Sequence, residues 1–403
     1  MKWEKVRLGE LYSVHNGLSK GSKFFGTGYP FLSFSTVFNN FFIPDELTDL
    51  VQSNEKEQDN YSILRGDVFV TRTSETSDEL GMSCVALKDY PNATYNGFTK
   101  RMRPIDNNRV LPEYIGYYMR TPLFRGEFRA FSTMTTRASL KNEDLLGLTV
   151  ALPPVEAQKK IANILRHYDQ LIENNQKQIK LLEESAQRLY KEWFVDLRFP
   201  GYENVDIING VPEGWKKDYI ESKINLLSGY AFKSNEFNQE GKYKVVTIKN
   251  VKDGQFDGKN VNRIVEIPPN LPKHCKLKDG DILLSLTGNV GRVCMVNGKE
   301  YLLNQRVAKL KSRIPAYTYC LFRSKDMFDK MNSLANGAAQ QNLSPIRTGK
   351  IIVLYPPDNL ISKFERLVQP IIEKILFVNK NINVSLKARD CLLPKLMSGE
   401  LEV

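Results

Sequence analysis

The sequence predicts an α+β protein in which two similar mixed α/β domains are separated by two long helices packed as an antiparallel coiled coil. Three observations indicate this fold class. A succession of motifs occurs twice along the chain, each copy closes with a Pro-Pro pair, and a long charge-rich helical pattern follows each pair. At 403 residues, the chain also exceeds the roughly 250–300 residues at which single cores stop growing. We therefore expect an internal pseudo-two-fold repeat.

The repeat is recognised from landmarks that keep their order while their spacing changes. Each copy has a tryptophan-led opening, an aromatic or β-branched run, a Gly-Asp turn between strand patterns, a further strand pattern, and a strand that leads to Pro-Pro. The first copy reads KWEKVRLGELYSVHNG (2–17), YPFLSFSTV (29–37), LRGDVFVTRTSETSDELGMSCVAL (64–87), YNGFTKRMRPI (95–105) and LTVALPPVEAQ (148–158). The second copy reads GWKKDYIESKINLLSG (214–229), YKVVTIKNV (243–251), LKDGDILLSLTGNVGRVCMVNG (277–298), LLNQRVAKLKSRI (302–314) and IIVLYPPDNLI (351–361). Conserved order with drifting spacing favours duplication followed by divergence.

Four segments follow from these landmarks. We expect a first mixed domain over residues 1–154, a first long helix over 155–198, a second mixed domain over 199–357 and a second long helix over 358–403. Short mixed runs with turn signals predict a substantial antiparallel sheet in each domain.

The two helical patterns have apolar positions at alternating gaps of three and four residues, which is the spacing of a coiled-coil seam. The first seam holds Ile161, Ile164, Tyr168, Leu171, Asn175, Ile179, Leu182, Leu189 and Trp193. The second seam holds Phe364, Leu367, Ile371, Ile375, Val378 and Ile382. Asn175 is expected to fix the register, and Pro370 to kink the second helix or mark an irregular turn. Two ordinary core helices are the alternative, but the length of the patterns favours spacers that pair with each other.

Composition and charge restrict the classes of function. The net charge of +11 and the pI near 9.2 favour an anionic partner, most often nucleic acid, although a basic protein without such a partner has the same balance. The chain has no apolar run long enough to span a membrane, and its first residues lack a signal-peptide pattern. Five scattered cysteines and three scattered histidines predict neither a disulfide framework nor a metal site. We expect a cytoplasmic protein with no membrane partner.

No stretch of the sequence carries a complete catalytic motif. GSKFFGTG (21–28) lacks the lysine of a phosphate-binding loop, and the Pro-Pro contexts LPPV (152–155) and YPPD (355–358) lack the flanking residues of an amino-methyltransferase tetrad. Neither Gly-Asp strand is followed by the Glu-x-Lys of a metal-dependent nuclease. His167 and His274 have no second ligand in view and are read as structural or solvated. The sequence therefore predicts a binding protein with no catalytic residues and no metal.

Candidate DNA-contact residues fall at corresponding places in the two repeats. DNA readers use Arg and Lys for phosphates and guanine, Asn and Gln for adenine, and small hydroxyl residues where the backbone comes close. The first repeat offers Lys23, Arg72, Thr73, Lys100, Arg101, Arg103, Thr136 and Arg137. The second offers Lys233, Thr287, Asn289, Arg292, Gln305, Arg306, Gln340 and Gln341. Because the two sets differ, we expect two different half-sites on one duplex.

Over nearly its full length the chain resembles the DNA-specificity subunit (HsdS) of Type I restriction-modification systems. The resemblance rests on LPPVEAQKKIANIL (152–165), YKEWFVDLRFPGYE (190–203), VPEGW (211–215), SGYAFKSNEF (228–237), KDGDILLSLTGNVG (278–291) and LLPKLMSGELEV (392–403). The chain departs from the family pattern in two places. A Glu-Gln pair usually follows Pro-Pro, whereas the two copies here read Glu156-Ala157-Gln158 and Asp358-Asn359-Leu360. In the first repeat, Gly97-Phe98 replaces the usual Asn-Gln before the basic strand.

The resemblance implies two target-recognition domains, each reading one half of a split, asymmetric double-stranded DNA target. It implies that the conserved helices, with the seam residues given above, dock two modification subunits, and that two restriction subunits join the complex. In the family, S-adenosylmethionine is held by the modification subunits, which methylate adenine N6, and ATP and Mg by the restriction subunits. This chain would then bind no cofactor and be a non-catalytic subunit.

Two other functions remain compatible with the residues. The first is a stand-alone DNA-binding or interaction module of the same fold without a working methyltransferase partner. The second is an enzyme with an unfamiliar active site, which the missing motifs disfavour. Two intact repeats and an undamaged C-terminal motif favour the specificity subunit over the stand-alone module.

Overall fold

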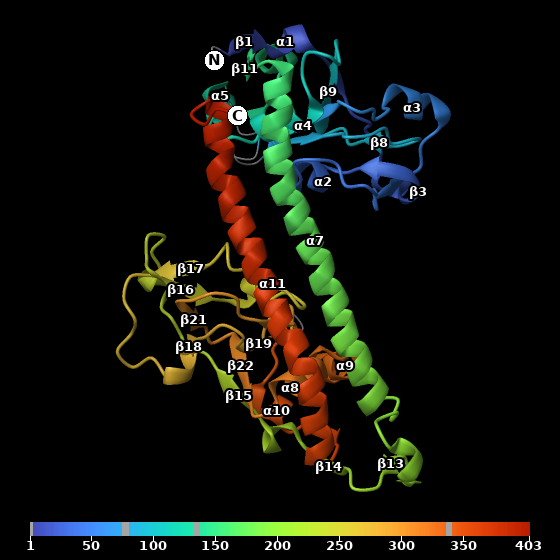
Figure 1. Ribbon diagram of the computed structural model, residues 1–403, viewed down its shortest axis with the longest axis vertical. Helices are drawn as coiled ribbons and strands as arrows, with labels where there is room; N and C mark the ends of the chain where they lie inside the picture. Colours follow the sequence, from blue (N-terminus) through green and yellow to red (C-terminus); the bar gives the residue numbers. More distant parts are fainter. Residues whose placement is uncertain (1–2, 75–79, 132–137, 336–340) are drawn as a thin grey trace. The chain divides into compact units, whose positions relative to one another are not determined.

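The computed structural model describes residues 3–74, 80–131, 138–335 and 341–403 of the chain. They belong to two compact units. Unit 1 comprises residues 1–171 and 385–403, and unit 2 comprises residues 172–384. Each unit therefore contains part of both long helices, α7 (Val155–Phe194) and α11 (Asp358–Ser398), which are drawn in green and red in Figure 1.

Unit 1 is built on a four-stranded antiparallel sheet in the order β2-β9-β5-β7. Its strands are β2 (Tyr12–Asn16), β9 (Thr99–Pro104), β5 (Val68–Thr71) and β7 (Ser83–Val85). A three-stranded sheet joins β4 (Leu50–Val51), β3 (Phe25–Leu32) and β8 (Thr94–Tyr95). Two ribbons pair β1 (Glu4–Arg7) with β11 (Thr149–Leu152) and β6 (Thr73–Ser74) with β10 (Ala138–Ser139). The helices are α1 (Leu8–Leu11), α2 (Phe34–Asn39), α3 (Glu55–Asn60), α4 (Pro112–Tyr118), α5 (Pro122–Phe131) and α6 (Asn142–Gly147).

Unit 2 repeats this plan. Its antiparallel sheet has the order β15-β22-β19-β20, from β15 (Ile224–Ser228), β22 (Val307–Ser312), β19 (Ile282–Ser285) and β20 (Val293–Met295). The second sheet joins β17 (Asn262–Ile264), β16 (Tyr243–Val246), β21 (Tyr301–Leu303) and β18 (Lys276–Leu277). Two ribbons pair β14 (Lys216–Tyr219) with β23 (Ile352–Tyr355) and β12 (Ile207–Ile208) with β13 (Val211–Pro212). The helices are α8 (Pro315–Arg323), α9 (Lys325–Leu334) and α10 (Pro345–Gly349).

The strand registers of the two units correspond. Val68 faces Met102 across β5 and β9, and the equivalent pair in unit 2 is Ile282 with Leu310. A parallel pair with the same partners also recurs, since β3 pairs with β8 and β16 pairs with β21. The predicted fold class, including the internal repeat, is confirmed.

The same Gly-Asp turn precedes the equivalent strands β5 and β19 in the two units. Asp67 accepts the backbone N–H of Leu64 at 2.8 Å, and Asp281 accepts that of Lys278 at 2.7 Å. In each turn the preceding glycine has a positive φ, 91° in the first and 83° in the second, which glycine adopts without steric cost. An aspartate that bonds its own turn fixes the chain where β5 or β19 begins.

The long helices pair antiparallel within each unit. In unit 1 the start of α7 (Ile161, Leu165) shares a hydrophobic core with the end of α11 (Leu393, Met397). In unit 2 the end of α7 shares a core with the start of α11, with members Ala186, Tyr190, Trp193, Leu360, Phe364 and Val368. Helix α11 continues through Pro370. Within the described ranges, no helix combines the length and the hydropathy needed to cross a bilayer.

Candidate nucleic-acid interface

The first loop cluster consists of residues 72–74, 96–98 and 138–140 of unit 1. The backbone N–H of Arg72 donates to the carbonyl of Phe98 at 2.8 Å, and the N–H of Leu140 donates to the carbonyl of Arg72 at 3.0 Å. Thr73 faces Ser139 in the β6–β10 ribbon. Three segments that are distant in the sequence are thus joined through Arg72, one of the predicted DNA-contact residues.

The second loop cluster consists of residues 286–289, 304–306 and 341–343 of unit 2. Its backbone bonds match those of the first, because the N–H of Leu286 donates to the carbonyl of Arg306 at 3.0 Å and the N–H of Leu343 donates to that of Leu286 at 2.7 Å. Thr287 forms a bridge with Asn342. The structure therefore brings together Thr287, Asn289, Gln305, Arg306 and Gln341 of the predicted set.

An asparagine shapes the middle loop of each cluster. The Oδ1 atom of Asn96 accepts the N–H of Phe98 at 2.7 Å, and the Oδ1 atom of Asn304 accepts that of Arg306 at 3.1 Å. Phe98 and Arg306 therefore occupy equivalent positions on the same kind of turn. The Gly97 position is tight, because an added Cβ would lie 2.3 Å from the Oγ atom of Ser19.

Exposure divides the predicted DNA-contact residues. The exposed ones are Lys23, Lys233, Asn289, Gln305, Arg306 and Gln341, and the half-buried ones are Arg72, Thr73, Thr287 and Arg292. The guanidinium of Arg292 lies 5.4 Å from the ring centroid of Phe328, and the Nζ atom of Lys23 lies 5.1 Å from that of Phe24. Thr136, Arg137 and Gln340 lie outside the described residues.

The basic run in β9 does not face outward as expected. Lys100 and Arg101 are only 5% and 4% exposed, because β9 lies between β2 and β5 and both faces of the sheet are covered. Burial, followed by the charge of Arg72, lowers the pKa of Lys100. A DNA-contact role for these two residues stays a prediction that their placement does not support.

The cations of β9 have partners inside unit 1. The Nζ atom of Lys100 donates to Asn142, and the Nη1 atom of Arg101 donates to the carbonyl of Ser62 at 2.6 Å. Arg103 makes a two-pronged contact with Asp67, with Nε at 2.8 Å and Nη2 at 2.6 Å from the carboxylate oxygens. These contacts stabilise the Gly-Asp turn and the sheet, so Lys100, Arg101 and Arg103 have a structural role independent of DNA binding.

Phe98 is not among the residues that the sequence predicts to contact DNA. Its side chain is 62% exposed, although it lies at the centre of the first loop cluster. The signal that could have found it is the alignment of the repeats, which places it opposite Arg306.

The predicted helix seam is only partly buried. Ile161, Trp193, Phe364, Ile375, Val378 and Ile382 are buried, while Ile164, Tyr168, Asn175, Ile179, Leu182, Leu189 and Ile371 are half-buried. Leu171 and Leu367 are exposed, and the residues that follow them, Ile172 and Val368, are buried instead. The expectation that both leucines lie in the seam is corrected, because a 3.6-residue helix drifts relative to a strict alternation of three and four.

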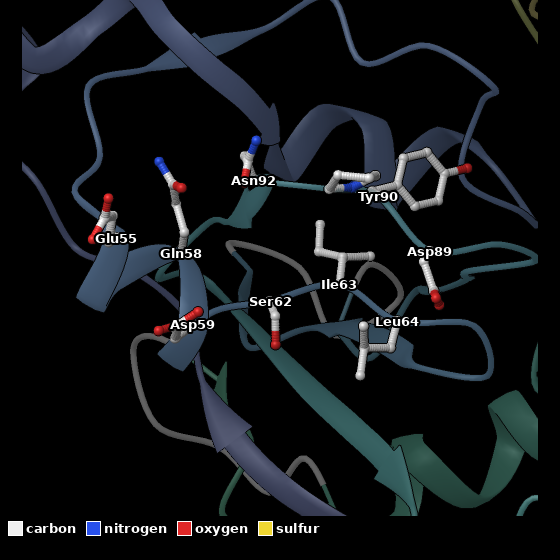
Figure 2. Close-up of a pocket in the computed structure, with 10 residues that line it drawn as sticks. Glu55, Gln58, Asp59, Ser62, Ile63, Leu64, Asp89, Tyr90 and Asn92 are labelled. Atoms are coloured by element: carbon white, nitrogen blue, oxygen red, sulfur yellow. The ribbon is translucent and has the colours of Figure 1, made fainter.

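A shallow pocket of unit 1 has the wrong charge for DNA. Figure 2 shows Glu55 and Asp59 from α3 on one side of it and Asp89 beside Tyr90 on the other. The described residues that line it include these three carboxylates and no lysine or arginine, so its field repels phosphate. Within the parts of the chain that the structure describes, no group of three potential metal ligands is assembled either.

Comparisons with known proteins give a consistent assignment. The sequence matches the family described as Type I restriction modification DNA specificity domain over residues 1–184 and 212–387. A similar protein is the Type I restriction enzyme MjaIX specificity subunit of Methanocaldococcus jannaschii, 26% identical over 419 residues that cover 100% of this chain and 94% of the relative. Another is the Type I restriction enzyme HindI specificity subunit of Haemophilus influenzae, 24% identical over 479 residues, with 99% of both chains covered.

A solved structure shares the fold. The crystal structure of the Type I restriction-modification system S subunit from M. genitalium matches with a TM-score of 0.56 and 16% sequence identity. The match covers 98% of this chain and 96% of that one. At this identity the likeness concerns the fold.

Proposed function

This chain belongs to the Type I restriction modification DNA specificity domain family, and we propose on that premise that it is the sequence-specific DNA-recognition subunit of a Type I restriction-modification complex. In this proposal each unit reads one half of a split, asymmetric double-stranded target. The long helices dock two modification subunits, and two restriction subunits complete the assembly. The complex works in the cytoplasm, where its DNA lies.

The observation that carries this proposal is the pair of matched loop clusters. Both are joined by the same backbone hydrogen bonds, yet they present different exposed side chains, with Phe98 in one and Gln305, Arg306 and Asn289 in the other. Base edges are told apart by the side chains that reach them, while backbone frames only position those side chains. Equivalent frames with different side chains support two half-sites of different sequence.

The division of chemistry among subunits is part of the proposal. We assign S-adenosylmethionine and adenine N6 methylation to the modification subunits, and ATP and Mg to the restriction subunits. The residues of this chain would supply base recognition and a docking surface. Apolar side chains that remain exposed on the helices, Leu181 of α7 and Phe377 and Val384 of α11, support the docking role.

The test of recognition is a base-resolution map of N6-methyladenine in host DNA with the gene present, deleted and restored. We expect a split motif with two short arms that disappears on deletion and returns on restoration. Exchanging residues 1–150 for those of another family member should then alter one arm only. Identical maps with and without the gene would contradict the proposal and favour the stand-alone binding module, whereas changes in both arms would contradict independent reading by the two units.

The test of docking uses a matched pair of valines in unit 2. Val384 on α11 is 66% exposed and Val265, just after β17, is 57% exposed. Val384→Asp should weaken co-purification with the modification subunit at least tenfold, because it places a charge in an apolar contact, which costs about 2 kcal/mol or more when the residue is central to an interface. Leu181→Asp should do the same from α7.

The control for docking is Val265→Asp, which makes the same chemical change away from the helices. It should leave co-purification and the unfolding temperature unchanged. Equal retention of the modification subunit by all three variants would remove these helix faces from the docking surface.

A further inference from the structure

The exposed phenyl ring of Phe98 occupies the place that an exposed guanidinium occupies in the other unit. Phe98 and Arg306 follow the equivalent asparagines Asn96 and Asn304. The carbonyl of Phe98 accepts the backbone N–H of Arg72, and the carbonyl of Arg306 accepts that of Leu286. The two side chains therefore leave equivalent turns. The guanidinium of Arg306 can donate several hydrogen bonds, and the phenyl ring of Phe98 can donate none.

The turn that carries Phe98 is held from three sides. The backbone N–H of Phe98 donates to the side chain of Asn96. The backbone carbonyl of Asn96 accepts both the N–H of Thr99 at 3.0 Å and the Oγ1–H of Thr99 at 2.7 Å. The Phe98 carbonyl accepts the N–H of Arg72 at 2.8 Å. An aromatic side chain that is exposed on a fixed turn loses little further backbone freedom when a partner covers it, which favours a role in binding.

The neighbouring charge identifies the class of partner. Arg72, which is joined to Phe98 through the backbone, is half-buried, and Lys23 elsewhere on the unit is exposed. A cationic residue joined to the turn of an exposed ring, on a unit that carries a further exposed cation, fits a polyanion that also offers an apolar surface. In duplex DNA the apolar group at a base edge is the 5-methyl of thymine in the major groove, whereas arginine pairs with the O6 and N7 acceptors of guanine.

We propose that Phe98 contacts a thymine 5-methyl group in the half-site of unit 1, and that Arg306 at the equivalent position reads a guanine in the half-site of unit 2. The inference rests on the proposed function and deepens it, because it names the base pair read at one position of each half-site. The same turn would thus serve A·T recognition in one unit and G·C recognition in the other.

The experiment measures binding by the complex that co-purifies with the tagged full-length chain. The probes are duplexes that carry the split motif found in the methylation map, with thymine replaced by deoxyuridine in one half-site at a time. Loss of one buried methyl should weaken binding by the wild-type complex about fourfold, and only in one half-site. Phe98→Ala should bind the thymine duplex about as weakly as wild type binds the deoxyuridine duplex, and should not respond to the replacement.

A reciprocal substitution sharpens the assignment. In the methylation map, Phe98→Arg should shift one position of one arm from T·A towards G·C, and Arg306→Phe should shift one position of the other arm in the opposite sense. Because both side chains are exposed, the unfolding temperature and co-purification should be unchanged, and Phe98→Leu should retain most of the response to the methyl group.

Three results would overturn the inference. They are a unit 1 half-site without an A·T pair, an equal response of wild type and Phe98→Ala to deoxyuridine, and a loss in Phe98→Ala that is the same on unrelated duplexes. Failure of the proposed function looks different, since the wild-type complex would then show no preference for the motif over an unrelated duplex.

Discussion

The same arginine of the repeat has different partners in the two units. Arg120 follows α4 and donates to four backbone carbonyls, those of Val37, Phe38, Asn40 and Ser83, at 2.6–3.0 Å. Arg323 ends α8 at the equivalent place and instead contacts Glu183 of α7 at 3.3 Å and Asp253 at 2.5 Å. One arginine thus organises a loop within its domain, and the other joins its domain to a long helix.

Helix α7 also contributes a different buried carboxylate to each unit, with different partners. In unit 1, Asp169 of α7 accepts from the Tyr117 hydroxyl and from Nη1 of Arg389 on α11 at 2.7 Å. In unit 2, Glu183 accepts from the Tyr319 hydroxyl at 2.5 Å and from Arg323.

These polar clusters are not copies of each other. When the two Pro-Pro pairs are aligned, Asp169 corresponds to Ile372 and Glu183 to Leu386, so neither carboxylate belongs to the repeated pattern. The fold was kept after duplication, while the polar contacts between the mixed domain and the long helices became different in each unit. The two units therefore share a fold but differ in the polar contacts that their domains make with the long helices.

The largest expected effect comes from Arg323→Met. It leaves Glu183 buried without its cation, which should lower the free energy of unfolding of unit 2 by about 3–5 kcal/mol at neutral pH. Burial already raises the pKa of Glu183. A carboxyl whose pKa is higher in the folded protein contributes its full stability below its ordinary pKa and loses it as pH rises through the raised value, so the cost should shrink on acidification. The free energy of unfolding of unit 2 is measured by urea denaturation, with hydrogen exchange in peptides of unit 2 as the readout.

Arg120→Met is the matched variant in unit 1. It should cost a few kcal/mol, about 3, because buried carbonyls lose their donor. Burial lowers the pKa of Arg120 to about 10, and carbonyls do not titrate, so the cost should be the same at neutral and mildly acidic pH. The same pH dependence in both variants would contradict the conclusion that the two arginines have different roles.

The predictable part of the fold rests on local constraints. Asp67 and Asp281 follow a glycine and bond their own turns, so both Gly-Asp turns could be recognised without knowing any distant partner. The helix seam was less predictable. Leu171 and Ile172 are both apolar, and the choice between them depends on the accumulated twist of the helix, which a pattern of three and four does not specify.

The candidate site was predictable in its loops and less so in its side chains. Arg72 and Arg306 were found because each is a basic residue in a loop that the two repeats share, and the structure joins each to its cluster. Lys100 and Arg101 belong to the predicted DNA-contact set because of their residue type, and residue type does not show that they are buried. Their partners come from loops and helices that lie 39 and 42 residues away in the sequence, so no local pattern announces them.

Smaller effects than those of the arginine variants are expected from Tyr117→Phe and Tyr319→Phe, which remove the two hydroxyls that donate to the buried carboxylates without leaving a cavity. Hydrogen bonds to charged groups contribute about 1.5–3 kcal/mol, so each variant should lose up to about that much stability. Tyr319→Phe should become less costly at acidic pH, because the hydrogen bond from Tyr319 holds the pKa of Glu183 down and its removal favours protonation of Glu183.

Tyr114→Phe provides the control for these two variants, since its hydroxyl donates to the neutral carbonyl of Ala151 at 2.8 Å and should contribute only about 0.5–1.5 kcal/mol. Urea unfolding at several pH values measures all three. A loss in Tyr319→Phe as small and as independent of pH as that in Tyr114→Phe would show that Arg323 alone sustains Glu183. Glu183 of α7 would then be held by its ion pair with Arg323, whereas Asp169 accepts hydrogen bonds both from Tyr117 of α4 and from Arg389 of α11.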